Sequence, residues 1–535
     1  MVELLSFAAA MLVATALLPA VRAYAGKLRL VDDPSPERKV HSDPIPRSGG
    51  IAIFIGAAVA IVLWIPFSQT YTALLFSILI VSCFGLLDDV FDLHHIWKFL
   101  PQFFAAFLVV WAYGGLPDLP LFELGATPRW LAALFSLILI VAITNAINLS
   151  DGLDGLAAGN CLFSFAILGV LAWGTGAQGY LVIALSIAGA IVGFLRFNTH
   201  PASIFMGDLG SQLIGFTAAA LTVALIATEQ LPVSPMVPIL LFGLPILDTL
   251  MVMAVRAHNG NNLFTADRNH LHHQLLDLGM RHYEVVTTLY ILQAIIVLAA
   301  YLLRYQSDWL LLGVYALYSG TIAGSIFVLK SLDTKLHEKP SDGSVDRRNT
   351  WLRKLNWYHL HTAKIISALV GVLLLVAGYV ADPLPESLSA LGIYAPLLLV
   401  GIWIVFNSYK ELVSRLIGYS AVAVSIYALA YGQLAGPIHG YVDIYFVGMV
   451  LALALAIRLT RRDVFHLDTQ DYLVGLFLIA FPILLDGYAD GASIVRLVAY
   501  TAILFYACEY VITKGDKTRW VINTAGIASI GLVAV

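Results

Sequence analysis

The sequence predicts an all-α protein that crosses a membrane many times, and three observations support this fold class. Of the 535 residues, 60% are hydrophobic and only 12% are charged, which is about half the charged fraction of a typical soluble domain. The mean hydropathy is +0.85. Apolar runs of about 18 residues or more recur along the whole chain, and each is long enough to cross the bilayer as a helix.

The expected spans fall into two groups. About eleven spans form a first module over residues 1–330, and about seven more form a second module over residues 361–535. A polar stretch that contains KSLDTKLHEKPSDGSVDRRNTWLRK separates them, so we expect a charged linker at residues 331–360. We find no internal repeat that would make one module a copy of the other.

Basic residues are distributed unevenly between the loops of the first module. If residue 1 lies outside the cell, the loops after odd-numbered spans hold most of them: Arg22, Lys27, Arg29, Arg38, Lys39, Arg47, Lys98, Arg196, Arg256, Arg268 and Arg281. The opposite loops hold only Arg129 and Arg304. By the positive-inside rule, the N-terminus is outside and the linker is cytoplasmic. The motifs LLDDVFDL, NLSDGLDG, FNTHPASIFMGDLGS and DRNHLHHQL then share the cytoplasmic side, which indicates one site at one membrane face.

Two acidic motifs are candidates for catalysis or metal binding. Asp88 and Asp89 end the third expected span, where adjacent carboxylates need a cation for stabilisation. In NAINLSDGLDG, the side chains of Asn148, Asp151 and Asp154 recur every three residues, so neighbours share a helical face. Oxygen ligands without thiols or imidazoles suit a hard cation such as Mg²⁺. The alternatives are a solvated helix end and an Asx- and Gly-rich loop that caps the next span.

Two further motifs lie at predicted span ends. Asp208 lies between two glycines at the start of a span, where it is either an N-cap or a metal ligand beside a helix N-terminus that favours phosphate. DRNHLHHQL combines one arginine with several imidazoles, and the spacing of the histidines does not place them together on one helical face as a zinc site requires. Binding of a diphosphate fits better, and contact with lipid headgroups is the alternative. Lys98 and Arg47 add positive charge for the same anion.

In series, these motifs resemble those of the polyprenyl-phosphate N-acetylhexosamine-1-phosphate transferases, and the resemblance covers roughly residues 1–330. It implies transfer of sugar 1-phosphate from a UDP-N-acetylhexosamine to a polyprenyl phosphate, with release of UMP. The H-x-H-H pattern is similar to the GlcNAc-using branch and implies the GlcNAc donor and undecaprenyl phosphate. The implied cofactor is Mg²⁺, with Mn²⁺ as an alternative. The implied location is a bacterial inner membrane, with the active site on the cytoplasmic face.

The resemblance also implies roles for individual residues. Asp208 is the expected metal ligand. The carboxylates of the catalytic centre are expected to be Asp88, Asp89, Asp151 and Asp154. The residues expected to bind the substrates are Asn148, Lys98, Arg47, Asn198, Phe205, Arg268, His270, His272 and His273. No nucleic-acid partner is expected, and a homodimer remains open.

Other functions remain open from the residues alone. An ion-coupled secondary transporter would also carry carboxylates, although such proteins place them near the midplane and often show inverted repeats. A hydrolase of lipid diphosphates would work without a polyprenyl acceptor. Residues 361–535 have no counterpart in the resemblance and contain no evident catalytic cluster.

Overall fold

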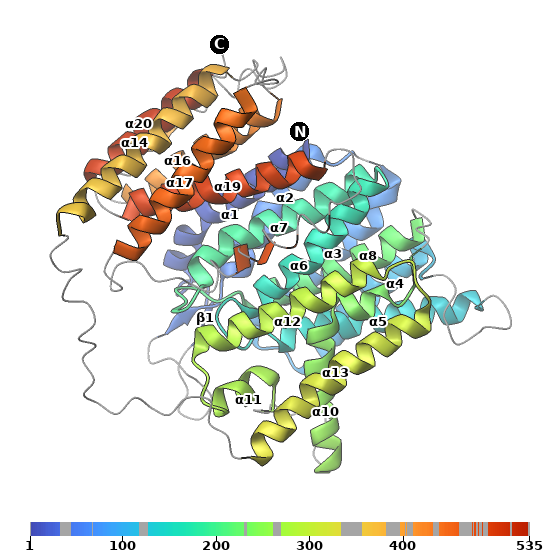
Figure 1. The fold of residues 1–535 in the computed structure, drawn as a ribbon. Coiled ribbons are helices and arrows are strands. Elements are labelled where there is room, and N and C mark those ends of the chain that lie inside the picture. Colours follow the sequence, from blue (N-terminus) through green and yellow to red (C-terminus); the bar gives the residue numbers. More distant parts are fainter. Residues whose placement is uncertain are drawn as a thin grey trace. The chain divides into compact units, whose positions relative to one another are not determined.

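The computed structural model describes most of the chain. The described residues are 2–32, 44–66, 68–116, 127–228, 233–260, 269–332, 356–380, 396–397, 399–401, 403, 410–431, 438–459, 473–474, 476–477, 480, 484, 491–513 and 516–532. Among them, nine helices are long and apolar enough to cross a membrane. The prediction of an all-α, multi-pass membrane protein is confirmed (Figure 1).

The chain divides into two compact units, which we describe separately. The first unit comprises Val2–Lys339 and the short segment Asp468–Ala480. The second comprises Pro340–Leu467 and Phe481–Val535. In the first unit, the ring of Phe477 from the short segment stacks on Phe163 with 4.7 Å between ring centroids. The division falls near the charged linker, but residues 468–480 group with the unit that precedes it.

The helices of the first unit follow the expected spans closely (Figure 1). Their bounds are α1 Val2–Tyr24, α2 Gly49–Trp64, α3 Gln69–Phe91, α4 His95–Tyr113, α5 Arg129–Leu149, α6 Leu156–Gly174, α7 Gln178–Asn198, α8 Gly207–Thr228, α9 Val237–Leu241, α10 Gly243–His258, α11 Leu271–Asp277, α12 His282–Leu302 and α13 Asp308–Ser331. Two short antiparallel strands, β1 Val31–Asp32 and β2 Ile45–Pro46, precede α2. They pair Val31 with Pro46 and Asp32 with Ile45.

Helix α8 lies at the centre of the first unit. All of its most apolar 18-residue window is buried, compared with 17% of the corresponding window of α13. Glycines allow neighbouring helices to approach it: a Cβ on Gly50 of α2 would lie 2.4 Å from the backbone nitrogen of Gly210. A Cβ on Gly85 of α3 would lie 2.7 Å from the Cα of Leu209. Close backbone approach through small residues is the usual way that helices pack in a membrane.

One expected span, 236–255, is two helices. The chain breaks at Phe242, between α9 and α10, and Pro245 explains the break because its ring excludes a hydrogen bond to the carbonyl four residues earlier. That carbonyl, of Leu241, instead accepts hydrogen bonds from Ser164 Oγ at 2.8 Å and Gln293 Nε2 at 2.9 Å. Side chains of α6 and α12 therefore satisfy the backbone group that the break releases.

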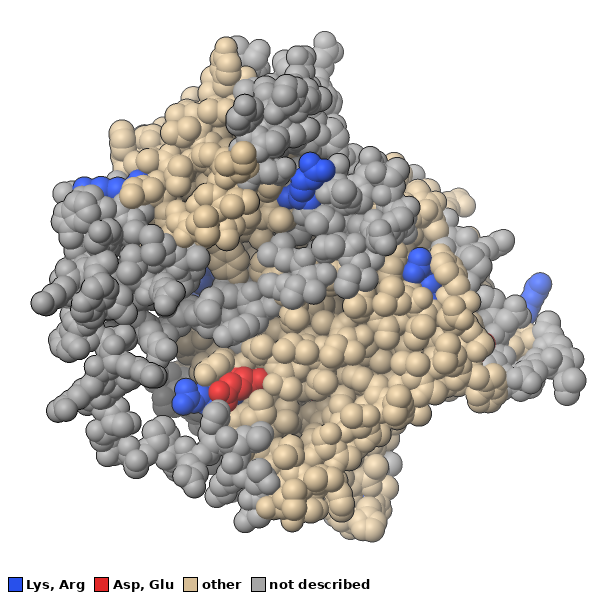
Figure 2. Space-filling model, viewed as in Figure 1, with Lys and Arg blue, Asp and Glu red and all other residues tan. Residues whose placement is uncertain are grey.

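The outer surface is apolar, as a lipid-facing surface requires. Helix α4 alone exposes several large aromatic residues, and the exposed fraction of Trp111 is 76%. On the face drawn in Figure 2, the described residues are almost all uncharged. Hydrophobic side chains that would be unfavourable in water are stable against lipid tails.

The described helices of the second unit are α14 Asn356–Val380, α16 Lys410–Tyr431, α17 Ile438–Leu459, α19 Gly491–Thr513 and α20 Asp516–Leu532. Helices α14, α16 and α20 pack against one another, and α19 packs on α16. Arg415 of α16 forms an ion pair with Glu509 of α19 at 2.9 Å, and the hydroxyl of Tyr419 donates to the same carboxylate at 2.9 Å. This largely buried polar contact joins two helices of the unit.

Candidate functional site

The C-terminal end of α3 and the N-terminal end of α8 meet at one end of the first unit. There the ammonium of Lys98, on α4, lies between two carboxylates. Its Nζ is 2.7 Å from Asp88 Oδ2 and 3.3 Å from Asp208 Oδ2. The side chain of Asp88 is 1% exposed, whereas those of Lys98 and Asp208 are each 29% exposed. Two carboxylates that are 120 residues apart in the sequence therefore share one cation, as the sequence predicted for a common site.

Helix α5 adds amide groups to the same place. Asn148 Nδ2 donates to Asp208 Oδ1 at 2.7 Å and to Ser211 Oγ at 2.7 Å. One turn earlier, Asn145 donates to Gln102 Oε1 at 2.6 Å, and Gln102 in turn donates to Gln212 Oε1 at 3.2 Å. These bonds link α4, α5 and α8. They hold Asp208 in one orientation, because its two oxygens face donors on different helices.

The carboxylate of Asp89 has a different role from that of Asp88. Its Oδ1 accepts the backbone N–H of Asp208 at 2.8 Å, and its Oδ2 accepts that of Leu209 at 2.9 Å. An anion at this position stabilises the N-terminus of α8 through both hydrogen bonding and the helix dipole. Gly207 makes the approach feasible: its φ is +74°, and a Cβ there would lie 2.8 Å from the oxygens of Asp89. Asp88 and Asp89, both expected in the catalytic centre, thus contact different partners.

The loop between α5 and α6 carries Asp151. Solvent reaches this side chain, yet its pKa is raised to about 7, first by desolvation against the surrounding protein and then by the negative charges of Asp208, Asp154 and Asp89. The negative charges of the carboxylates in this region therefore outnumber the single positive charge of Lys98. A hard divalent ion bound by oxygen ligands would offset this excess. The residues present therefore fit the magnesium ion that the sequence implied.

A second group of contacts fixes the loop between α7 and α8. Asn198 uses both ends of its buried amide: its Oδ1 accepts the N–H of Gly155 at 2.9 Å, and its Nδ2 donates to the carbonyl of Ile204 at 2.9 Å. Asp154 Oδ2 lies 2.7 Å from His200 Nδ1 and accepts the N–H of Ala202 at 3.1 Å. Burial alone would raise the pKa of Asp154, but these hydrogen bonds hold it below its usual value. These contacts join the two loops into one rim of the site.

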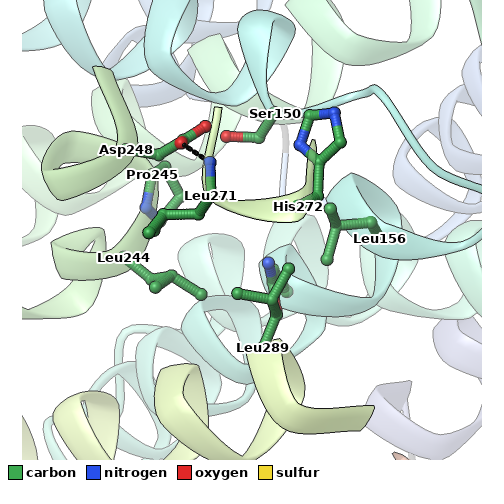
Figure 3. Close-up of a pocket in the computed structure, with 9 residues that line it drawn as sticks. Ser150, Leu156, Leu244, Pro245, Asp248, Leu271, His272 and Leu289 are labelled. Atoms are coloured by element: carbon green, nitrogen blue, oxygen red, sulfur yellow. Dashed lines mark hydrogen bonds between the residues drawn. The ribbon is translucent and has the colours of Figure 1, made fainter. Parts of the chain in front are cut away.

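Asp248 is a residue that the sequence reasoning missed. It lies buried in α10, where its Oδ2 is 2.9 Å from Nδ1 of His270 and its Oδ1 accepts the N–H of Leu271 at 2.6 Å. The dashed line in Figure 3 marks the second contact. A lone carboxylate inside an apolar span is costly unless it is paired. The position of Asp248 within the run LPILDTLMVM therefore indicated that it has a partner. Its partner, however, cannot be read from spacing.

His272 packs against Gly152, in the loop between α5 and α6. It is 2% exposed, and burial, followed by the charge of His273, lowers its pKa to about 3. Its Nε2 has no hydrogen-bond partner among the described residues, and a Cβ on Gly152 would lie 2.4 Å from that atom. Figure 3 shows His272 and Asp248 at a small cavity beside Ser150. The H-x-H-H motif is thus placed against the SDGLDG loop.

The structure brings most of the predicted residues together. Phe205 fixes the backbone near β2 through two hydrogen bonds. Its N–H donates to the carbonyl of Pro46 at 2.7 Å, and its own carbonyl accepts the N–H of Gly49 at 2.9 Å. Arg47 is half-buried, and its carbonyl lies beside Gly207 at the start of α8. The ring of His273 lies 4.2 Å from that of His272. Arg268 lies outside the described residues.

Comparison with known proteins gives one consistent result. The sequence profile of glycosyl transferase family 4 matches residues 71–226, which include the ends of α3, α5 and α8 described above. A probable undecaprenyl-phosphate N-acetylglucosaminyl 1-phosphate transferase of Bacillus subtilis is 35% identical over 312 residues, which is 57% of this chain and 86% of that protein.

Two relatives from other bacteria agree. The decaprenyl-phosphate N-acetylglucosaminephosphotransferase of Mycobacterium tuberculosis H37Rv is 34% identical over 52% of this chain and 77% of its own length. The undecaprenyl-phosphate alpha-N-acetylglucosaminyl 1-phosphate transferase of Escherichia coli K12 is 30% identical over 55% of this chain and 83% of its own length. Because these relatives match over most of their length, the chain belongs to glycosyl transferase family 4.

Proposed function

We propose that this protein transfers N-acetylhexosamine 1-phosphate, with GlcNAc as the first candidate, from a UDP-sugar to a polyprenyl phosphate. The three relatives are named as transferases of this kind. In the net reaction, an oxygen of the lipid phosphate forms a bond to the β-phosphorus of the UDP-sugar. The bond from that phosphorus to the bridging oxygen breaks, and UMP leaves. The product is a polyprenyl-diphospho-sugar.

The observation that carries the proposal is the shared contact of Lys98 with Asp88 and Asp208. Phosphoryl transfer depends mostly on positioning and charge neutralisation. Lys98 and the two aspartates would position and neutralise the phosphates at the ends of the membrane-spanning helices. Asp88 is buried at the end of a span, where a lipid phosphate entering from the bilayer would arrive. It would orient that phosphate or accept its proton, while Lys98 would neutralise charge on the transferred group.

Asp208 and the amide oxygen of Asn148 are the groups that would hold a magnesium ion. When bound, Mg²⁺ would neutralise negative charge on the diphosphate. The chain's own residues then set the geometry: Asn148 fixes the carboxylate of Asp208, and Asp89 fixes the start of the helix that carries it. His272 packs against Gly152 of the SDGLDG loop, and the ring of His273 lies beside it. Together with His270, they would contact the nucleotide diphosphate.

The proposal includes an orientation. The uneven distribution of Lys and Arg supports an N-terminus outside the cell and an active site that faces the cytoplasm. The relatives named above are bacterial proteins, so the proposed location is a bacterial inner membrane. That face supplies a soluble nucleotide sugar, and the bilayer supplies the lipid acceptor. No nucleic acid takes part in this reaction.

A direct assay tests the proposal. Purified protein in lipid nanodiscs would receive UDP-N-acetylhexosamines labelled in the sugar, together with undecaprenyl phosphate and Mg²⁺. We expect label to enter an organic-extractable product and UMP to appear in equal amount. Release of UMP that is independent of the polyprenyl acceptor would indicate a hydrolase instead. Ion-coupled solute movement in vesicles without any UMP would favour a transporter.

A further inference from the structure

Three potential metal ligands converge at the rim of the site, and Asp208 is not one of them. They are Asp154 in the loop after α5, His200 in the loop after α7, and His282 at the start of α12. Each offers one ligand atom, and these atoms lie within 4.8 Å of one another. The segments that carry them are up to 128 residues apart in the sequence, so the cluster is a product of the fold.

The two imidazoles are in direct contact. Their rings stack at 4.0 Å between centroids with 18° between planes. The Nδ1 atom of His282 is buried and has no hydrogen-bond partner in the part of the chain that the structure describes. A buried ring nitrogen without a partner costs free energy, and a metal ion is one ligand that would offset this cost. His200 is 49% exposed, which leaves an open path from solvent.

We propose that Asp154, His200 and His282 form a second metal site, specific for a transition-metal dication such as Zn²⁺. Two imidazole nitrogens and one carboxylate oxygen are a common zinc ligand set, and a water molecule completes the tetrahedron. The same set disfavours Mg²⁺, which prefers oxygen ligands. The site at Asp208 offers only oxygen ligands and one lysine, so the two sites differ in the ions that they select.

Binding requires a small rearrangement. His200 Nδ1 and Asp154 Oδ2 are 2.7 Å apart, which is a hydrogen-bond distance. Two ligands on tetrahedral zinc, with bonds of about 2.0–2.2 Å, are separated by roughly 3.4 Å. If this nitrogen is the ligand, the pair at 2.7 Å moves apart by about 0.7 Å, and any proton held between them passes to solvent as the ion binds. The N–H of Ala202, which donates to the same oxygen, can remain in place.

The site has a consequence for activity, and this part of the inference rests on the proposed function. Asp154 belongs to the loop that we place at the nucleotide sugar. A zinc ion on Asp154 would add positive charge and bulk at that loop and fix the start of α12 against it. We therefore expect Zn²⁺ to inhibit the transferase by raising the apparent KM for the UDP-sugar.

A binding experiment tests the site without reference to catalysis. Metal-free full-length protein in nanodiscs would be titrated with Co²⁺, whose visible absorption reports nitrogen ligation in tetrahedral geometry, and then with Zn²⁺ as competitor, in excess Mg²⁺. We expect one equivalent bound in the parent protein. We expect at least about tenfold weaker binding in His200→Ala and His282→Ala, because each loses a ligand. His258→Ala, an exposed histidine at the end of α10, is the matched control and should bind as the parent does.

The outcomes separate the two proposals. Equal Co²⁺ binding by the parent and both ligand variants, or loss of binding only in His273→Ala, would place the ion elsewhere and overturn the site. Metal binding without any transferase activity would leave the site in place and contradict the proposed function. Transferase activity that Zn²⁺ inhibits equally in the parent and in His282→Ala would remove the link between the site and the nucleotide sugar.

Discussion

The carboxylate of Asp89 accepts the backbone N–H of Asp208 at 2.8 Å, so the end of α3 holds the start of α8. The second oxygen accepts the N–H of Leu209, so Asp89 satisfies two of the N–H groups that the start of α8 leaves without a partner inside the helix. Asp208, which would bind the metal, is therefore positioned by Asp89. Asp89 is next in the sequence to Asp88, which would act on the lipid phosphate. A change at Asp89 should act through geometry, whereas a change at Asp88 should act on turnover itself.

Replacing Asp89 with asparagine tests this distinction. The new amide would retain one acceptor and lose the negative charge at the helix N-terminus, so we expect a loss of about 1–2 kcal/mol in the free energy of unfolding. Turnover should fall roughly tenfold or more, because Asp208 moves. Asp88→Asn should lower kcat without weakening nucleotide binding. Asp92→Asn is the control, because Asp92 is exposed and its left-handed backbone suits asparagine.

Lys98 competes with any cation for the two aspartates that it contacts. In Lys98→Gln, we expect kcat to fall and the half-saturating Mg²⁺ concentration to fall several-fold, because Asp208 loses its resident positive charge. The buried carboxylate of Asp88 also loses its partner, so the variant should be less stable without Mg²⁺ and should gain more stability on its addition. Steady-state kinetics and thermal unfolding across a Mg²⁺ series measure both effects. An unchanged Mg²⁺ dependence would contradict this arrangement.

Gly152 leaves the space that His272 occupies. A methyl group at Gly152 would lie 2.4 Å from Nε2 of His272, so Gly152→Ala must displace the ring. We expect the KM for the UDP-sugar to rise roughly tenfold with a smaller change in kcat, since the loop and the imidazole move but Asp88 does not. Gly320→Ala in α13 is the matched control, because no atom lies within 4 Å of the added carbon. Equal kinetics in both variants would show that His272 does not contact the substrate.

His272 should make the stability of the protein depend on pH. Burial lowers its pKa to about 3 from the usual 6.5, so the unfolded chain binds the proton more readily than the folded one. The stabilisation is complete above pH 6.5 and is lost as the pH falls toward 3. Between about pH 7 and pH 5.5, the free energy of unfolding of the parent protein should fall by about 1 kcal/mol more than that of His272→Gln. Unfolding in nanodiscs at both pH values provides the measurement, and parallel losses would contradict the assignment.

Asp248 should position His270 by fixing its tautomer. Because the carboxylate lies 2.9 Å from Nδ1, it holds a proton on that nitrogen and leaves Nε2 as an acceptor. In Asp248→Asn, the amide can present its N–H to Nδ1 and reverse the tautomer, so we expect a loss of roughly 10- to 100-fold in kcat/KM and an altered pH profile. Asp277→Asn, at an exposed position of α11, is the control. A pure loss of stability with unchanged kinetics would assign Asp248 a structural role only.

The sequence predicted the helices well because the length of an apolar run is a local property. For example, the expected span 70–87 corresponds to α3, Gln69–Phe91. The break at Phe242 was not predicted, because Pro245 within an apolar run is compatible with either a kinked helix or two helices. Which of these forms depends on whether other helices satisfy the released carbonyl, as Ser164 and Gln293 do here. Such partners are set by tertiary packing.

The candidate site was predictable in its residue types but not in its pairings. Positive-inside sidedness placed the acidic and histidine motifs at one face, and the structure joins Asp88, Asn148 and Asp208 there. The separate partners of Asp88 and Asp89 could not be predicted, since adjacent residues on a helix differ in direction by about 100°. His200 lies within the motif FNTHPASIFMGDLGS, but nothing in the sequence indicated that it would meet His282, because their contact exists only in the folded chain.

The break between α9 and α10 has a consequence for biogenesis. The carbonyl of Leu241 is satisfied only by side chains of α6 and α12 among the described residues, and α12 is synthesised later than the break. Ser164 of α6 precedes the break in the sequence and can donate to this carbonyl first, whereas the second donor, Gln293, comes only with α12. We therefore expect the break to reach its final set of hydrogen bonds only when α12 has packed against α6 and α9, late in the assembly of the unit.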